Sequence, residues 1–112
     1  SRTAGTLLRA LDLEKDDEVQ AAFLLALGRL ASTEAVQRLA RTAEPERGLF
    51  KRKTTALRVA AVQGLAEART PDAQQALRSL SDDRDEDVRT AAVFALGRIA
   101  RQSASMERPT LE

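Results

Sequence analysis

The chain has 112 residues, of which 43% are hydrophobic but only 3% aromatic, so alanine and leucine must form most of the core of one small domain. Eighteen basic residues against 17 acidic ones give a net charge of +1, which excludes global electrostatic attraction to nucleic acid or an anionic membrane. The lack of cysteine excludes disulfides and thiolate chemistry and suits a cytoplasmic location. Since no run of about 18 apolar residues occurs, we expect no membrane span.

Residues 1–12 are the first predicted helix. Its large apolar residues are Leu7, Leu8 and Leu11, and Leu8 is in register with Leu39 and Leu77 of two later helices. We call helices of this kind B-type, and the more apolar helices that alternate with them A-type. The opening segment is therefore predicted to be a half repeat, a B-type helix without a preceding A-type helix.

Residues 13–44 are predicted to be a complete repeat. Its A-type segment, residues 19–30, reads VQAAFLLALGRL. The apolar stripe expected at helical spacing consists of Val19, Ala22, Phe23, Ala26, Leu27 and Leu30. Asp16 precedes the segment as a predicted N-cap. Ser32 is expected to open the B-type helix, whose apolar positions are Ala35, Val36, Leu39, Ala40 and Ala43.

An insertion at residues 44–53, EPERGLFKRK, interrupts the repeat. An apolar pair, Leu49 and Phe50, is followed by Lys51, Arg52 and Lys53. The favoured interpretation is that the pair fills a groove between repeats, because an exposed Phe is unusual without a use. The alternative is an anchor for a phosphate, a membrane headgroup or an acidic partner.

Residues 54–81 form the second predicted repeat, and residues 82–101 form a final half repeat. Their A-type segments begin after the predicted N-caps Thr54 and Asp85, and the second B-type helix begins at Thr70-Pro71. Arg101 stands where Ser32 and Thr70 stood, so we expect no further capped helix. Residues 102–112 are expected to be a partly disordered or cloning-derived tail. The predicted order is thus B, A-B, A-B, A.

The last A-type segment, residues 88–99, reads VRTAAVFALGRI. With an acidic turn before it, this pattern resembles the bacterial HEAT repeats, including those of phycobilisome lyases. Gln20 departs from the recurring Arg of the family, and Ala66 departs from its Gly. The resemblance implies an all-α, right-handed α-solenoid of six helices. It also implies that the B-type helices line the concave face, with the candidate partner-binding residues Arg9, Gln37, Arg38, Arg41, Gln74, Gln75 and Arg78.

Catalysis is hard to assemble, because the chain has no His, Cys, Tyr or Trp. We predict no catalytic residue, no metal ligand and no cofactor. The densest acidic cluster consists of Asp82, Asp83, Asp85, Glu86 and Asp87. It is interpreted as a solvated turn that caps the last A-type helix, with a cation or basic partner as the alternative. Arg58 and Arg89 are expected to tie adjacent repeats together.

The predicted function is a non-enzymatic scaffold or regulatory module that binds a protein, with an acidic segment as the expected ligand, within a longer repeat array. Two alternatives stay open. One is binding of a nucleic-acid backbone through Arg and Lys; the other, implied only by the resemblance, is an accessory role of the bilin-lyase type. The uncovered ends of the array predict either self-association end to end or a tail that folds back over the last A-type helix.

Overall fold

The computed structural model describes residues 2–45 and 53–107, the last three of them by backbone only. These residues form six α-helices and no strand. The helices are α1 (Arg2–Leu13), α2 (Asp17–Leu30), α3 (Thr33–Ala43), α4 (Thr55–Ala68), α5 (Pro71–Leu80) and α6 (Glu86–Glu107). The predicted all-α solenoid of six helices is confirmed. In the described part of the chain, every helix is too short or too polar to cross a membrane.

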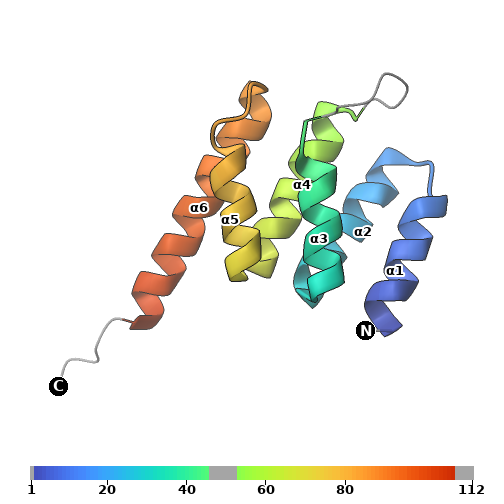
Figure 1. Cartoon of the computed structure of the whole chain (residues 1–112), viewed down its shortest axis with the longest axis horizontal. Helices are drawn as coiled ribbons and strands as arrows, with labels where there is room; N and C mark the ends of the chain where they lie inside the picture. Colours follow the sequence, from blue (N-terminus) through green and yellow to red (C-terminus); the bar gives the residue numbers. More distant parts are fainter. Residues whose placement is uncertain (1, 46–52, 108–112) are drawn as a thin grey trace.

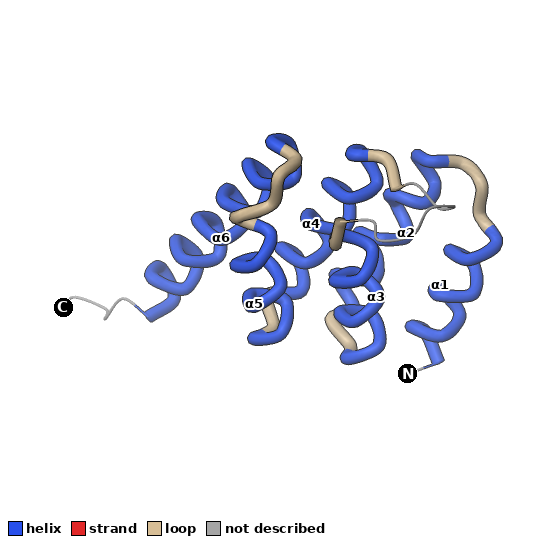
Figure 2. Tube along the Cα trace, turned by 45° about the horizontal axis from the view of Figure 1, so that its top comes forward, coloured by secondary structure: helices blue, strands red, loops and turns tan. Residues whose placement is uncertain are grey.

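The helices lie in two rows. The A-type helices α2, α4 and α6 pack on one another in order, and the B-type helices α1, α3 and α5 form the second row (Figures 1 and 2). The most extensive contact joins α2 to α4. Because each helix packs mainly on its neighbours along the array, the core runs between the two rows rather than gathering at one centre. The wholly buried larger side chains are Leu24, Leu27, Leu39, Leu65, Leu77, Val62 and Val88.

The predicted N-caps are confirmed. The Asp16 carboxylate accepts the N–H groups of Glu18 at 2.9 Å and Val19 at 3.1 Å. Thr54 accepts the N–H of Leu57 at 3.1 Å. Each bond satisfies a first-turn donor that has no partner within the helix. Ser32, Thr70 and Asp85 cap α3, α5 and α6 in the same way.

The turns from A-type to B-type helices need an unusual backbone. Ala31 and Arg69 end α2 and α4 with positive φ angles of 55° and 57°, the left-handed conformation that closes many helices. Their N–H groups donate to the carbonyls of Leu27 and Leu65, both at 3.1 Å. At the equivalent place after Ile99, Arg101 stands instead of a Ser or Thr that would open a new helix, and α6 continues to Glu107, into the predicted tail.

Small residues allow two helices to pack closely where α2 meets α4. A Cβ atom on Gly28 would overlap the backbone of Gly64, and one on Gly64 would lie 2.7 Å from the carbonyl oxygen of Leu24. Glycine lets the two backbones approach to a distance that a methyl group would prevent. This contact explains how a core with few aromatic residues fills its volume.

One predicted apolar stripe is only partly buried. In α2, Val19 and Leu30 are 39% and 38% exposed, and Ala22 is exposed as well, whereas Leu24 and Gly28 are buried. In α2 the apolar stripe therefore does not coincide with the buried face. The reason is positional: no described A-type helix precedes α2, so the side that α4 and α6 turn toward the preceding helix is open.

Candidate interaction surface

A buried ion pair fixes the end of the groove between α3 and α5. The Arg58 guanidinium, on α4, donates to the carbonyl of Ala43 at 2.9 Å and to the carboxylate of Asp83 at 2.5 Å. Arg89 donates to the carbonyl of Asp83 at 3.0 Å. Arg58 thus joins the end of α3 to the α5–α6 turn, which confirms its predicted structural role.

The Asp83 carboxylate is held in its charged form. Burial alone would raise its pKa, but the hydrogen bond and charge of Arg58 and the N–H of Asp85 outweigh burial and lower the pKa below its ordinary value. Asp83 is only 9% exposed, so the interpretation of the whole acidic cluster as a solvated turn is wrong at this residue. The cluster contributes one buried partner to Arg58 as well as a cap.

Asp85 does act as the predicted cap. It accepts the N–H groups of Asp87 at 2.9 Å and Val88 at 3.3 Å. It also accepts the Thr55 hydroxyl at 2.6 Å. The Thr55 hydrogen bond is the main cause that lowers the pKa of Asp85. Among the residues that the structure describes, no three acidic side chains are arranged to hold a metal ion.

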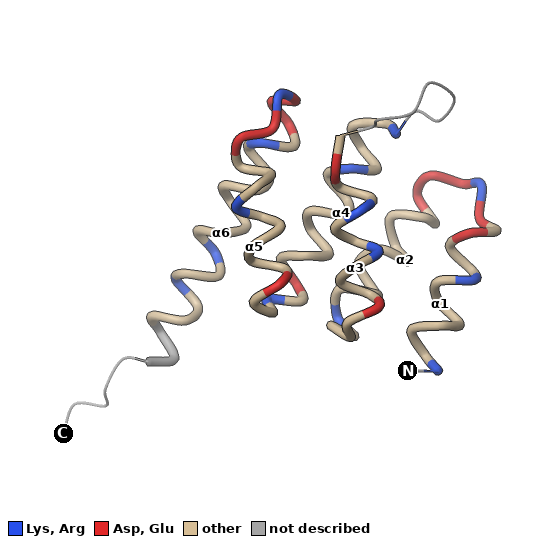
Figure 3. The backbone as a smooth tube through the Cα atoms, in the orientation of Figure 1, with Lys and Arg blue, Asp and Glu red and all other residues tan. Residues whose placement is uncertain are grey.

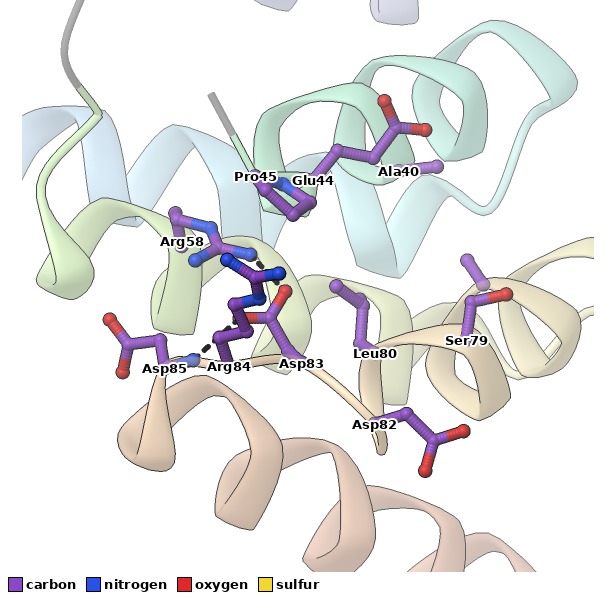
Figure 4. A pocket seen from close by; sticks show the side chains of 11 residues that line it. Ala40, Glu44, Pro45, Arg58, Ser79, Leu80, Asp82, Asp83, Arg84 and Asp85 are labelled. Atoms are coloured by element: carbon purple, nitrogen blue, oxygen red, sulfur yellow. Dashed lines mark hydrogen bonds and ion pairs between the residues drawn. The ribbon is translucent and has the colours of Figure 1, made fainter. Parts of the chain in front are cut away.

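A cavity of about 770 Å³ opens between the carboxyl-terminal ends of α3 and α5. Ala40, Ala76 and Leu80 supply apolar lining, and Arg58 and Arg84 supply cationic groups. Figure 4 shows both arginine side chains extending into this space, one from α4 and one from the α5–α6 turn. Arg58 is committed to Asp83, whereas exposed Arg84 makes no ion pair with any described residue. The lining also includes Glu44, Asp82, Asp83 and Asp85. The cavity therefore presents charges of both signs around its apolar lining, and the apolar part can accept an apolar side chain.

The candidate partner-binding residues of the B-type helices lie on α1, α3 and α5. Some of them are already engaged in contacts within the chain. Arg38 binds Asp12 of α1 at 2.7 Å, which lowers the pKa of Asp12 through that hydrogen bond. Gln74 donates to the carbonyl of Arg69 at 2.9 Å. The first contact joins α3 to α1, and the second ties α5 to the turn that precedes it. Both reduce what Arg38 and Gln74 can offer to a partner.

Three arginines on the B-type helices have no carboxylate partner among the described residues. Arg9 on α1, Arg41 on α3 and Arg78 on α5 are all exposed. Arg78 donates only to the neutral side chain of Gln75, at 3.2 Å, while Gln37 is exposed on the same row. The blue segments of the backbone in Figure 3 mark basic residues on each of the three B-type helices. We call Arg9, Arg41 and Arg78 the arginine row.

The predictions for Leu49, Phe50, Lys51 and Arg52 lie outside the described residues. Lys53, at the edge of the insertion, is described. Its ammonium group donates to the carbonyls of Arg41 at 2.5 Å and Glu44 at 3.1 Å. Both carbonyls belong to the end of α3, where a cation is favoured by the helix dipole. Lys53 therefore closes a helix end.

A second charged arrangement was missed by reasoning from the sequence. Glu67 of α4 lies between Arg29 of α2, at 3.9 Å, and Arg98 of α6, at 3.3 Å. The three residues are equivalent, since each precedes the final apolar residue of its A-type segment. The alternation of charge at one repeat position was the signal that could have revealed this ladder.

The protein class follows from this geometry together with one comparison. A family model described as HEAT repeats matches residues 46–107, more than half of the chain. The chain therefore belongs to the HEAT-repeat family. A search of curated proteins gives no match.

Proposed function

We propose that this chain is a non-enzymatic module that holds an acidic segment of a partner protein along its B-type helices. The observation that carries the proposal is the arginine row: Arg9, Arg41 and Arg78 are exposed on three successive helices of one layer, without carboxylate partners among the described residues. HEAT repeats commonly bind other proteins, which supports the coarser statement that this is a binding module.

The spacing of the row indicates the form of the ligand. Neighbouring packed helices lie about 8–10 Å apart, and an extended chain advances about 3.3 Å per residue. A segment that crosses the B-type helices in extended form would therefore place an acidic side chain at each arginine if every third residue were Asp or Glu. Arginine suits this role, because its planar guanidinium can bind a carboxylate through two parallel hydrogen bonds.

The cavity beside the row adds a second contact. Its apolar lining from Ala40, Ala76 and Leu80 can take one side chain of the segment, while the Arg58–Asp83 pair keeps its wall rigid. Apolar burial would supply affinity, and the arginine row would supply register, since exposed charges fix orientation more than they add binding energy. The overall net charge of +1 requires that any such attraction be local.

Nucleic-acid binding is the runner-up, because the same arginines could contact phosphates. The B-type helices carry no aromatic side chain on which a base could stack, and this observation favours the protein ligand. The accessory role of the bilin-lyase type rests only on the sequence resemblance.

The test is a titration with a labelled peptide that carries glutamate at every third position, followed by fluorescence anisotropy. We expect binding that weakens about tenfold or more when Arg9, Arg41 and Arg78 are all changed to Gln. The matched control changes Lys15, Arg69 and Arg101 to Gln, which removes the same charge from exposed residues outside the B-type helices and should leave affinity unchanged. Equal loss in both triple variants would reject the row as a site, and tighter binding of duplex DNA with the same arginine dependence would favour the runner-up.

A further inference from the structure

The outer side of α6 carries two exposed apolar side chains next to a cavity. Val93 is 55% exposed and Phe94 is 69% exposed. A cavity of about 470 Å³ lies along them, and its lining includes Gly97 and Arg101. Large exposed apolar side chains beside a hollow are typical of a contact surface. No described helix covers this side of α6.

The repeat shows what kind of element fits there. The A-type segments align so that Leu24, Val62 and Val93 are equivalent, and so are Gly28, Ala66 and Gly97. The first two members of each set are buried. In α2 the Leu24 and Gly28 side receives Gly64 of α4. In α4 the Val62 and Ala66 side faces α6. The exposed side of α6 is therefore the position at which a further A-type helix packs.

The helix that packs at this position makes its contact through small residues. In α4 that face carries Ala60 and Gly64, and in α6 it carries the equivalent Ala91 and Ala95. A Cβ atom on Gly64 would lie only 2.7 Å from the Leu24 carbonyl oxygen. Small side chains, one helical turn apart, are what permits such close packing.

The ladder of charged residues predicts one more side chain of the helix that would pack on α6. Going along the A-type helices, the ladder reads Arg29, Glu67, Arg98, with contacts of 3.9 Å and 3.3 Å. The next helix would place its equivalent residue beside Arg98, whose side chain is 51% exposed. An acidic residue continues the alternation there, whereas a basic residue would face a like charge.

We infer that the exposed side of α6 docks a partner α-helix that lies parallel to α6 and carries two small residues four apart, followed three residues later by Asp or Glu. The parallel direction follows from α2, α4 and α6, which all run the same way (Figure 1). The inference is independent of the arginine row, because it concerns the other layer. A second copy of this chain fits less well: α2 offers Ala22 and Ala26, but its Arg29 would meet Arg98.

The probe is a labelled peptide with the sequence of residues 54–69, which contains Ala60, Gly64 and Glu67 in the required spacing. Anisotropy is measured against the whole chain. We expect binding that Phe94→Glu weakens at least about tenfold, with Val93→Glu as a second variant. The matched control is Leu13→Glu, at another apolar residue that is 81% exposed; it should leave affinity unchanged.

A charge exchange tests the predicted acid. The peptide with Glu67→Lys should bind the natural chain several-fold more weakly, and Arg98→Glu in the chain should restore its affinity. Circular dichroism melts check that each chain variant is folded. Absence of binding, or equal binding of both peptides by the natural chain, would overturn the inference. Phe94-dependent self-association of the chain in sedimentation would also overturn it, because the occupant would then be a second copy.

Discussion

Gly28 of α2 packs directly against Gly64 of α4, and neither position has room for a methyl group. We predict that Gly28→Ala lowers the free energy of unfolding by about 1–3 kcal/mol or more, because two backbones must separate. The matched control is Gly97→Ala at the equivalent position of α6, where a Cβ atom would lie 3.4 Å from only the mobile end of Arg101. That change should stabilise by about 0.5–1 kcal/mol through helix propensity. Chemical denaturation measures both, and equal effects would contradict the proposed contact.

The Arg58–Asp83 pair should contribute strongly to the free energy of unfolding. Asp83→Asn is expected to cost about 3–5 kcal/mol, because it leaves the Arg58 charge buried without its partner. The exposed neighbour provides the control, Asp82→Asn, which should change stability by less than about 0.5 kcal/mol. Urea denaturation of the two variants tests the difference, and a similar small effect for both would show that the pair does not hold the α5–α6 turn.

The sign of the pH dependence follows from the lowered pKa of Asp83. The contribution of a carboxylate with a lowered folded-state pKa is fully present above its unfolded value, about 3.9, and is lost as the pH falls from there through the folded value. Thermal midpoints of the natural chain should therefore fall below about pH 4, and this fall should be smaller in Asp83→Asn. A parallel fall in the two proteins would remove Asp83 as a cause.

The two left-handed residues offer stabilising substitutions. Ala31 and Arg69 adopt φ angles of 55° and 57°, which cost a residue with a Cβ atom about 1 kcal/mol. We predict that Ala31→Gly and Arg69→Gly each raise the free energy of unfolding by up to about 1 kcal/mol. Ala100→Gly is the control, since the equivalent Ala100 lies inside α6; there glycine should destabilise by about 1 kcal/mol. If all three substitutions shifted the thermal melting midpoint in the same direction, the left-handed conformations of the two turns would be contradicted.

Burial differs between equivalent residues of α2 and α4. Ala60 is 7% exposed, and Ala60→Asp should place an unpaired charge between helices at a cost of several kcal/mol, roughly enough to unfold a domain of ordinary stability. Ala22, at the same repeat position, is exposed, so Ala22→Asp should change the melting midpoint little. Loss of folding in both variants would mean that the Ala22 side of α2 is covered after all.

Local chemistry explains why much of this fold could be predicted from the sequence. Asp16, Thr54 and Thr70 identify the starts of helices, because an N-cap side chain bonds a backbone N–H no more than three residues away. The pairing of Arg58 with Asp83 could not be predicted, since five neighbouring acidic residues offered equivalent charges and only the turn after α5 selects one. The exposed side of α2 was missed for a similar reason: the apolar period identifies a helix, but the number of neighbours decides how much of it is buried.

The arginine row is tested most directly by exchanging one charge pair. Because α3 lies between α1 and α5, the central glutamate of a peptide with glutamate at every third position should meet Arg41 in either chain direction. We predict that Arg41→Glu, or a central Glu→Lys change in the peptide, weakens binding about tenfold, and that the two changes together restore it. Lys15→Glu, at an exposed residue outside the row, should give no such recovery. Failure of the double change to recover affinity, or equal recovery with Lys15→Glu, would contradict binding through the arginine row.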